Sequence, residues 1–479
     1  MASNRVKSSG AAERAHDLRA SGMLARFLLV GIGVWLHAAD SLVTATIAPA
    51  IALDLHGIAY INWTISLYQV GAIVAGAAAA ALCARWGIKR VFISATLIYA
   101  GGCVMGAAAP TMGILVLGRL IQGMGGGMLL SLSYVAIEAW FAPELWGRLF
   151  AIDATIWGAG SLLGPLIGGA FSGSHLWRGA FWAFTLQAMA LCALAALWMP
   201  AAERKAAAIG RWPVIPLLIL SAATLIIAEA GVASGLPGGV MASIIGCAAG
   251  SALLYLAARL DRRAAVRLLP PQLLDTAHPI GAGLAMVFTL AISTVGFWAY
   301  GPLILKLLFD TKPLVTGYIL AGEAIAWSIA TMAVARVTPA DDQWVIRGGA
   351  VCIAIGAAGF ALVVPAGSLT GTVVCALLQG GGFGVCWPAV VQRTVRLSEP
   401  ADRTLASSSV STMQRIGYAV GTAAVGIAAN LSGLSDSISA TAAKTAGFWV
   451  FAAFVPMLIL GLICAWRFTA SGVASRPVL

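Results

Sequence analysis

Long apolar runs separated by short polar turns dominate this sequence of 479 residues. A helix needs about 20 apolar residues to cross the roughly 30 Å hydrocarbon core of a bilayer. Fourteen stretches reach that length: 24–53, 60–83, 90–110, 112–138, 147–172, 179–200, 213–233, 238–259, 279–306, 315–336, 346–365, 368–392, 404–430 and 446–467. Charged residues make up only 10% of the chain, against about 25% in soluble domains. The sequence therefore predicts an all-α membrane protein with fourteen spans.

Lysine and arginine fall mainly on one side of these predicted spans. With the N-terminus inside, 23 of the 29 Lys and Arg residues lie in cytoplasmic segments, as the positive-inside rule expects. Removing one span would invert every later turn and lose this asymmetry. We therefore expect a multi-pass protein of the cell membrane, the inner membrane in a bacterium, with both termini cytoplasmic. The same distribution argues against nucleic acid as the reason for the net charge of +11.

The sequence has no pattern typical of a metal site or an enzyme. Its eight cysteines lie in apolar segments without a CxxC pair or an accompanying His cluster, so neither a metal site nor a disulfide framework is indicated. Walker A and HExxH motifs are absent, and no GxSxG occurs in a strand-turn-helix context. We expect a protein without enzymatic activity, bound metal or cofactor.

A motif in the fourth span recurs in the twelfth. LIQGMGGGM (Leu120–Met128) is similar to LLQGGGFGV (Leu377–Val385). The alternative is chance similarity between glycine-rich helices. A true repeat predicts two six-helix bundles, and parallel repeats of this kind place the substrate site at their interface near the midplane. The domains expected are a tail (1–22), an N-terminal bundle (23–200), a linker with two additional membrane helices (201–278), a C-terminal bundle (279–470) and a tail (471–479).

The fifth span contains the stretch GAGSLLGPLIGG, in which small residues recur every four positions. Gly160, Gly164 and Gly168 predict a bare helix face that another helix can approach closely, and Pro165 is expected to bend the helix. Together with Gly169, these residues resemble the fifth-helix antiporter motif of major facilitator superfamily exporters. We expect the bare face to let the two halves close on the outer side, and the motif argues against uptake by symport.

Two further segments resemble motifs of the same superfamily. Arg119 and Gln122 match the fourth-helix R-x-x-Q-G, in which the family associates the Arg with proton coupling. A charged side chain inside a span costs about 2.5–3.5 kcal/mol on insertion scales; the alternative role is structural.

The turn ALCARWGIKRVF resembles the family's cytoplasmic gating loop, G-x-L-a-D-R-x-G-r-k. It matches at Arg85, Gly87, Lys89 and Arg90 but has Ala84 in place of the acid that helps to latch the halves. The resemblance implies a weakened inner latch, or a substitute acid at Asp153.

The first span resembles the D-x-T-x-x-N-x-A-x-P pattern of fourteen-helix drug:proton antiporters through Asp40 and Pro49. Leu42 and Ala45 depart from it. Spacing similar to that branch also occurs in the second span and around Arg415 in the thirteenth. The resemblance covers essentially the whole chain.

Counting about 1.5 Å per helical residue places three ionisable side chains at a similar depth. Asp40, Arg119 and Glu323 come out about 10–12 Å below the outer face of the core, and Asp153 about 6 Å from the inner face. We expect these four residues to carry proton coupling, with Arg119 holding whichever carboxylate is ionised. The alternative is a structural ion-pair network.

Aromatic and polar side chains at mid-depth are candidates for a substrate cavity. A carboxylate among aromatic rings suits a lipophilic cation. The candidates are Trp35, Tyr68, Gln122, Trp157, Trp298, Tyr300, Trp327 and Arg415.

The resemblance implies a proton-coupled antiporter that exports lipophilic small molecules, cationic ones among them, by alternating access. It would be driven by the proton gradient, with the lipid bilayer, protons and the substrate as partners, and would act as a monomer. Export of an endogenous lipid or metabolite is an alternative, and uptake by proton symport is a weaker one. A non-transporting scaffold would leave Asp40 and Arg119 at one depth without a reason.

Overall fold

The computed structural model describes residues 23–56, 61–171, 176–199, 213–233, 239–311, 313–335, 337–338, 340–434 and 440–470. The expected tails 1–22 and 471–479, the whole linker segment 201–212 and Arg336 lie outside these residues. Within the described ranges every regular element is an α-helix. The helices are α2 (Met23–Asp54), α3 (Ile61–Trp86), α4 (Ile88–Ala107), α5 (Met112–Trp140), α6 (Pro143–Phe171), α7 (Trp177–Trp198), α8 (Val214–Ala233), α9 (Gly239–Asp261), α10 (Pro279–Phe309), α11 (Pro313–Val334), α12 (Asp342–Val363), α13 (Leu369–Leu397), α14 (Arg403–Leu431), α15 (Ala440–Ala452) and α16 (Val455–Ala470).

Thirteen helical segments of the described chain are long and apolar enough to cross a membrane, with α15 and α16 counted as one. The helix α14 matches the remaining expected span but is too polar for this test. Its serines at 407–409 and 411 are buried and donate to carbonyls three or four residues earlier in their own helix. A polar helix of this kind is tolerated at membrane depth because protein, rather than lipid, surrounds it.

The last expected span, 446–467, is divided in the structure into α15 and α16. The break falls at Ala453 and Phe454, just before Pro456 in the first turn of α16. Proline lacks a backbone donor and is tolerated in a first helical turn but not in a helix interior. The expected span is confirmed as one membrane-length segment, Thr441–Ala470, which the turn at Ala453 and Phe454 interrupts.

Helix ends follow local signals. Gly87 separates α3 from α4 at φ 78°, a left-handed conformation that glycine adopts without a Cβ penalty. At the start of α10, His278 Nδ1 accepts from the Ile280 N–H at 3.2 Å. At the start of α13, Ser368 Oγ accepts from the Gly371 N–H at 3.1 Å. Both side chains satisfy donors that a first helical turn leaves unpaired.

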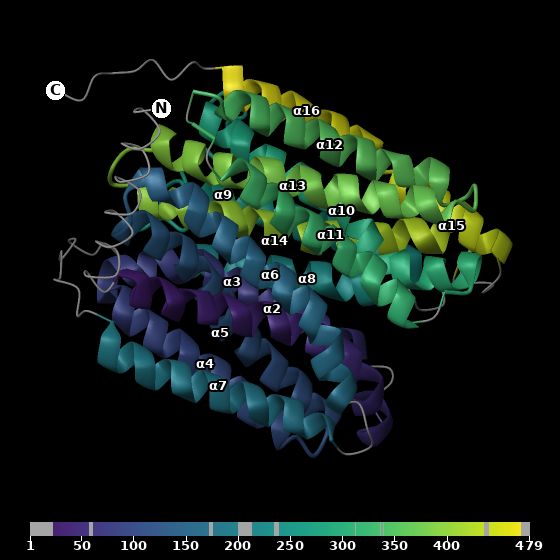
Figure 1. Ribbon diagram of the computed structural model, residues 1–479, viewed down its shortest axis with the longest axis horizontal. Helices are drawn as coiled ribbons and strands as arrows, with labels where there is room; N and C mark the ends of the chain where they lie inside the picture. Colours follow the sequence, from purple (N-terminus) through teal and green to yellow (C-terminus); the bar gives the residue numbers. More distant parts are fainter. Residues whose placement is uncertain are drawn as a thin grey trace, which may run out of the picture.

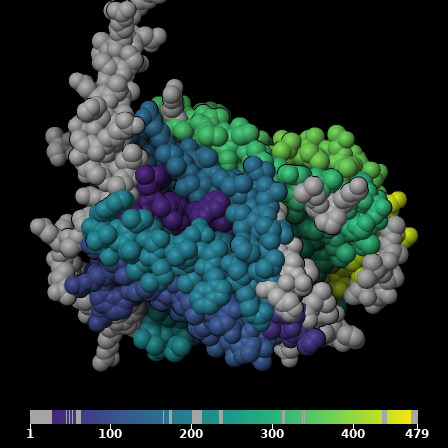
Figure 2. All heavy atoms as spheres, turned by 60° about the horizontal axis from the view of Figure 1, so that its bottom comes forward, coloured from purple at the N-terminus to yellow at the C-terminus, as the bar shows by residue number. Residues whose placement is uncertain are grey.

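The helices pack as an N-terminal group (α2–α7) and a C-terminal group (α10–α16), which lie side by side in Figure 1. In the first group α5 packs against α3 and α4, and α2 packs against α6; in the second, α13 packs against α11 and α12, and α10 packs against α14. The two groups meet where α6 contacts α11 and where α14 contacts α3 and α5. The space-filling view shows them as adjoining purple-to-teal and green-to-yellow masses (Figure 2).

The helices α8 and α9 form a hairpin between the two groups in sequence. They pack extensively on each other, and both contact α14, while α8 also contacts α3. Their other faces expose large apolar side chains such as Ile215, Leu218, Met241 and Ile245. Exposed apolar surface on a helix of membrane length is the expected lipid-facing surface.

The repeated glycine motif places corresponding helix pairs in close contact in both groups. A Cβ on Gly123 would lie 2.0 Å from the carbonyl oxygen of Tyr68, and one on Gly380 would lie 2.1 Å from that of Glu323. One turn later, a Cβ on Gly127 would lie 2.3 Å from Ala72. The corresponding Cβ on Gly384 would lie 2.2 Å from the Trp327 carbonyl. The repeat seen in the sequence is therefore also a repeat of helix contacts, in which α3 and α5 correspond to α11 and α13.

We predict that Gly127→Ala destabilises the protein, because a methyl group there meets the backbone of α3, which cannot rotate away. Overpacking of this kind costs about 1–3 kcal/mol. Thermal unfolding in detergent, followed by size-exclusion chromatography, should show a lower midpoint. The matched control is Gly101→Ala on α4, where no atom lies within 4 Å of the new Cβ, so its midpoint should be unchanged or higher. Equal midpoints for the two variants would contradict the close contact.

Candidate functional site

A buried ion pair between α2 and α5 lies at the centre of the N-terminal group. Arg119 Nη1 donates to both carboxylate oxygens of Asp40, at 3.0 and 2.9 Å. Both side chains are almost fully inaccessible, with 2% and 0% of their surface exposed. The sequence analysis placed these two residues at a similar depth, and the structure brings them into direct contact. A buried pair of this kind is retained only where further hydrogen bonds satisfy the remaining polar atoms.

Neighbouring side chains supply those further hydrogen bonds. Gln122 accepts from Arg119 Nη1 at 2.8 Å and donates to Asp40 Oδ1 at 2.9 Å. Thr44 Oγ1 also donates to Asp40 Oδ1, at 3.2 Å, and Arg119 Nε donates to the Thr64 carbonyl at 3.1 Å. Gln122 thus contacts both members of the pair and fixes their relative orientation.

A second set of contacts leads from this pair toward the C-terminal group. The guanidinium of Arg119 lies over the ring of Tyr68, 4.2 Å from its centroid. Tyr68 Oη is 2.7 Å from His37 Nδ1, and His37 Nε2 is 2.7 Å from Arg415 Nη2 on α14. Arg415 Nη1 also donates to Gln69 at 3.4 Å. Side chains of α2, α3, α5 and α14 therefore form one buried polar cluster that joins the two groups.

Glu323 lies on α11 of the C-terminal group. Its backbone carbonyl lies against Gly380 of α13, just as the Tyr68 carbonyl lies against Gly123 of α5 in the N-terminal group. Gln379 Nε2 donates to Glu323 Oε1 at 2.8 Å, and Trp298 lies near this carboxyl group. Glu323 Oε2 and Gln379 Oε1 are buried and have no hydrogen-bond partner in the described part of the chain. In this structure Arg119 hydrogen-bonds Asp40, Gln122 and the Thr64 carbonyl, so of the two carboxylates it is Asp40 that Arg119 holds here.

The two carboxylates occupy related settings with one difference. Gln122 and Gln379 hold corresponding positions in the repeat, and each donates to the carboxylate of its own group. In the first group Arg119 precedes the repeat, whereas the second has Ala376 at that position. Only the N-terminal group therefore has an arginine at this place in the repeat.

The expected cavity residues divide into those near this cluster and those elsewhere. Trp157 meets the His37 ring edge-on at a centroid distance of 5.7 Å, so Tyr68, Gln122, Trp157 and Arg415 all belong to the cluster. Trp35 does not join them, because its indole donates to Gln187 of α7 at 3.2 Å in an exposed position. That interaction directs it toward α7 rather than toward the C-terminal group.

The remaining aromatic candidates belong to the C-terminal group. Trp327 stacks on Phe383 at 4.9 Å and meets Trp387 at 5.7 Å. Tyr300 is half-buried against the apolar core of the same group. Trp298 is 38% exposed and reaches Glu323. The identified contacts of these residues are thus within the C-terminal group and not with Asp40.

The small-residue face of α6 packs within its own group, and this corrects the expected closure between halves. Cβ atoms on Gly160, Gly164 and Gly168 would meet Ala38, Leu42 and Thr46 of α2, at 3.2, 2.5 and 2.6 Å. The period of four residues matches two helices of the same group in near-parallel contact. Gly169 has open space at its Cβ position, and the backbone stays helical through Pro165.

Gly158, two residues before that face, is the glycine of this stretch that faces the other group. A Cβ there would lie 2.5 Å from Ser328 Oγ of α11. Ser328 Oγ also donates to the Ala154 carbonyl of α6 at 2.6 Å. The contact between α6 and α11 therefore depends on the start of the stretch, not on its four-residue repeat.

The gating-loop motif is anchored to α7. Lys89 Nζ donates to the carbonyls of Ala196 and Met199 at 2.8 and 2.7 Å, where a helix C-terminus leaves acceptors free. Arg85 lies over the adjacent Trp86 ring at 5.9 Å, and Arg90 is exposed. Asp153 is buried on α6 and lies near Ser133 of α5, so its identified neighbour is within the N-terminal group.

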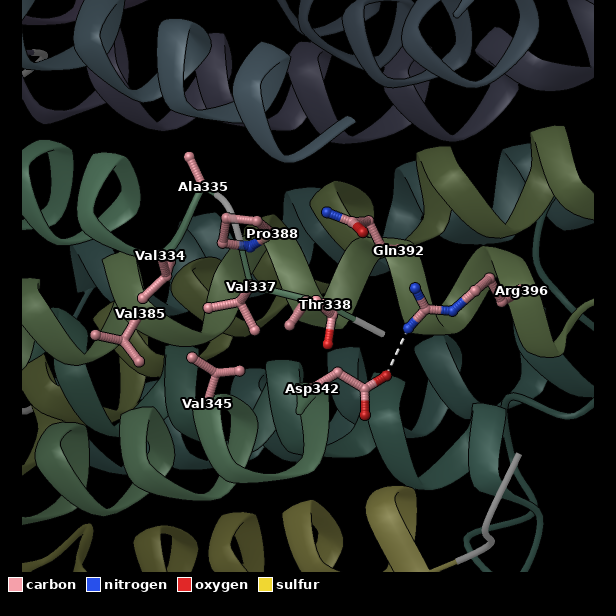
Figure 3. Close-up of a pocket in the computed structure, with 11 residues that line it drawn as sticks. Val334, Ala335, Val337, Thr338, Asp342, Val345, Val385, Pro388, Gln392 and Arg396 are labelled. Carbon is pink, nitrogen blue, oxygen red and sulfur yellow. Dashed lines mark hydrogen bonds and ion pairs between the residues drawn. The ribbon is translucent and has the colours of Figure 1, made fainter. Parts of the chain in front are cut away.

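The corresponding turn of the C-terminal group holds an ion-pair cluster. Asp342, the first residue of α12, binds Arg393 at 2.7 Å and Arg396 at 2.5 Å. Figure 3 shows Asp342 and Arg396 facing one another across a small pocket, which Val337, Thr338 and Gln392 also line. The sequence pattern that could have predicted this cluster is Asp342 after α11 together with Arg393 and Arg396, which lie one helical turn apart on α13.

Hydrogen bonds between the groups run from the central cluster to one end of the bundle. We call it the basic end, because the Arg85–Arg90 turn and the Asp342–Arg396 cluster lie there. Trp387 Nε1 donates to Tyr134 Oη at 3.1 Å, and Thr404 Oγ1 donates to Glu138 at 3.1 Å. Nearby, a Cβ on Gly147 would lie 2.6 Å from the Ala335 carbonyl. These contacts hold the two groups together at the basic end.

The fold and this arrangement of charges are those of a membrane transporter. Residues 30–337, more than half of the chain, match the family model of the Major Facilitator Superfamily. The protein therefore belongs to the Major Facilitator Superfamily.

Curated relatives and solved structures agree with this family. A probable multidrug-efflux transporter of Mycobacterium tuberculosis is 27% identical, over 93% of this chain and 96% of its own length. A multidrug resistance protein B homolog of the same organism is 26% identical, over 81% of this chain and 72% of its own. The human organic anion transporter TETRAN has the same fold, with a TM-score of 0.68 at 12% identity over 92% of this chain and 98% of that chain. A proton:xylose symporter has a TM-score of 0.63 at 15% identity, over 94% and 96%.

We predict that Asp40→Asn lowers the thermal midpoint strongly, because it leaves the Arg119 charge buried without its partner. Breaking a buried pair in this way costs about 3–5 kcal/mol. The double variant Asp40→Asn/Arg119→Gln should recover part of the loss, since both charges are then removed. Thermal unfolding in detergent measures all three proteins.

The matched control is Asp310→Asn, at an exposed ion pair with Lys306. Exposed pairs contribute little to stability, so this variant should unfold with the wild type. A midpoint for Asp40→Asn as high as that of Asp310→Asn would show that the buried pair does not stabilise the fold.

Proposed function

We propose that this protein is a proton-coupled antiporter of the fourteen-helix drug:proton branch, and that it exports lipophilic small molecules, cationic ones among them. Its architecture would be two six-helix bundles, formed by the N-terminal and C-terminal groups, with α8 and α9 as the inserted pair. The observation that carries the proposal is the fully buried pair of Asp40 and Arg119, held by Gln122. Ionisable residues inside membrane helices mark ion and proton pathways by default.

The pair offers a chemical basis for coupling. An ionised Asp40 binds Arg119 through two short contacts, and protonation of the carboxylate removes the charge that these contacts depend on. Arg119 would then be free to reorient, and the close packing of α5 on α3 at Gly123 and Gly127 would transmit that movement. Protonation and helix rearrangement are thereby linked in the same group of residues.

The C-terminal group supplies the features that suit the substrate. Glu323 is a buried carboxyl group whose identified hydrogen bond within the described residues comes from Gln379, and Trp298, Tyr300 and Trp327 lie on the same two helices, α10 and α11. A carboxylate with aromatic rings nearby binds an organic cation through charge and cation–π attraction. The names of the two Mycobacterium tuberculosis relatives, which describe multidrug efflux and multidrug resistance, also favour export of such compounds.

Orientation follows from the charge asymmetry of the chain. The positive-inside rule assigns the basic end to the cytoplasm, with both termini there, in the cell membrane. The hydrogen bonds of Trp387 and Thr404 at that end would then close the cytoplasmic side. Alternating access requires those contacts to separate. The protein would work as a monomer in the bilayer, with the proton gradient as its energy source and no cofactor.

We predict that Asp40→Asn and Glu323→Gln each abolish efflux of a lipophilic cation driven by an imposed pH gradient in proteoliposomes. Neither side chain can then exchange a proton, so the gradient has no group on which to act. The measurement is the initial rate of export across a panel of cationic and neutral compounds, with and without the gradient. Size-exclusion chromatography establishes that each variant is folded.

The control for Glu323→Gln is Glu229→Gln. Glu229 is an exposed carboxylate on α8, and its replacement should leave the export rate near that of the wild type. Gradient-driven transport that persists in both Asp40→Asn and Glu323→Gln would refute the coupling mechanism. Transport that does not respond to the gradient in the wild-type protein would refute antiport itself.

A further inference from the structure

His37 is a buried histidine that links three helices and both groups. It lies on α2 one turn before Asp40 and is 2% exposed. Its ring stacks on Tyr68 at a centroid distance of 5.4 Å and meets Trp157 edge-on. Both ring nitrogens have polar neighbours at 2.7 Å, namely Tyr68 Oη and Arg415 Nη2. It therefore carries the hydrogen bond between α2 and α14.

The partners of the ring determine its protonation state. Arginine has donors only and remains charged in proteins, so His37 Nε2 must accept the hydrogen bond from Arg415. A nitrogen that accepts carries no proton, and the ring is therefore neutral with its proton on Nδ1. That proton faces Tyr68 Oη, which accepts it. The hydrogen-bond network thus assigns a single tautomer.

A protonated ring is incompatible with this contact. An imidazolium presents N–H donors at both nitrogens, so Nε2–H would point at a guanidinium N–H 2.7 Å away. The two groups would also carry the same charge in a site with little access to water, where like-charge repulsion is strong. Protonation must break the hydrogen bond between His37 and Arg415.

We propose that His37 is a second proton-binding site, distinct from the carboxylates, and that its protonation releases α14 of the C-terminal group from α2 of the N-terminal group. The neutral ring holds the groups together at the centre, and the charged ring repels Arg415 and separates them there. This inference stands on the contact geometry of His37 and is independent of the substrate proposed above.

Charged and titratable groups surround the ring on each neighbouring helix. Arg415 faces it from α14 and Tyr68 from α3, while Arg119 on α5 lies over the Tyr68 ring, 4.2 Å from its centroid. Asp40 is three residues further along α2 and is paired with Arg119. The negative charge nearest to His37 is thus already bound, and the cation that His37 contacts is Arg415.

A glycine on α5 leaves space for the His37 ring. A Cβ on Gly126 of α5 would lie 2.6 Å from Tyr68 Oη and 2.9 Å from His37 Nδ1. The glycine motif of α5 therefore leaves room for the His37–Tyr68 pair as well as for α3. A histidine that served only to fill space would not need this clearance together with two polar partners.

The test measures the separation of the groups directly. Spin labels introduced as unnatural amino acids at Ile65 of α3 and Leu431 of α14, both exposed, report the distance between helix ends opposite the basic end. In the wild-type protein the population at longer distance should grow several-fold as the pH falls from about 8 to about 4. The range extends below that of an exposed histidine, because burial and the charge of Arg415 oppose protonation of the ring.

Three variants isolate His37 from other titrating groups. His37→Gln can accept from Arg415 but cannot take up a proton, so its distances should stay short at both pH values. His37→Asn is too short to reach Arg415 and should give the longer distance at both. His56→Gln replaces an exposed histidine at the end of α2 and should follow the wild type.

Any of three results would overturn the proposal. It fails if the wild type shows no change with pH, if His37→Gln opens at low pH as the wild type does, or if His37→Asn keeps the short distance throughout. Because the distances are measured without substrate, they remain decisive if the protein exports no drug. Loss of gradient-driven efflux with an intact distance response would refute the proposed function and leave the His37 site standing.

Discussion

The exclusion of water from the bundle is the constraint on which the rest of the structure depends. A charge at membrane depth must find its partners inside the protein, and Asp40 and Arg119 do so through each other, Gln122, Thr44 and the Thr64 carbonyl. Because these partners come from α2, α3 and α5, the charge network also fixes how three helices pack. The same constraint explains why α14, the most polar helix, lies among other helices and not in lipid.

Close helix packing makes those polar contacts possible. Glycines at 123 and 127 bring α5 against the backbone of α3, and Gly126 leaves space for the rings of His37 and Tyr68. In the C-terminal group, Gly380 and Gly384 produce the same approach of α13 to α11. The two groups therefore share a scaffold but differ in charge, since an arginine at position 119 corresponds to Ala376. Among the residues that the structure describes, the carboxylate of Asp40 is therefore fully hydrogen-bonded, while Glu323 Oε2 has no hydrogen-bond partner.

Sequence patterns predicted the elements well and their partners less well. Apolar length gave the helices, including α14, whose span is apolar only in its second half. The resemblance to transporter motifs selected Asp40, Arg119 and Gln122, which the structure brings into contact. It did not find His37, although a histidine one turn before Asp40 on the same helix was a usable signal. Spacing of small residues correctly indicated a bare face on α6 but not which helix covers it, because a helix face carries no information about its neighbour.

The sequence by itself determined that this chain is a multi-pass helical membrane protein with two related halves, because apolar length, charge asymmetry and a repeated motif are local properties. Only the tertiary structure decided which charges meet. It separated Glu323 from Arg119, directed Trp35 to α7, placed Gly160, Gly164 and Gly168 against α2, and joined the halves through His37 and Arg415. The physical reason is that pairing depends on helix rotation and tilt, and these are set by the sum of side-chain contacts along each helix.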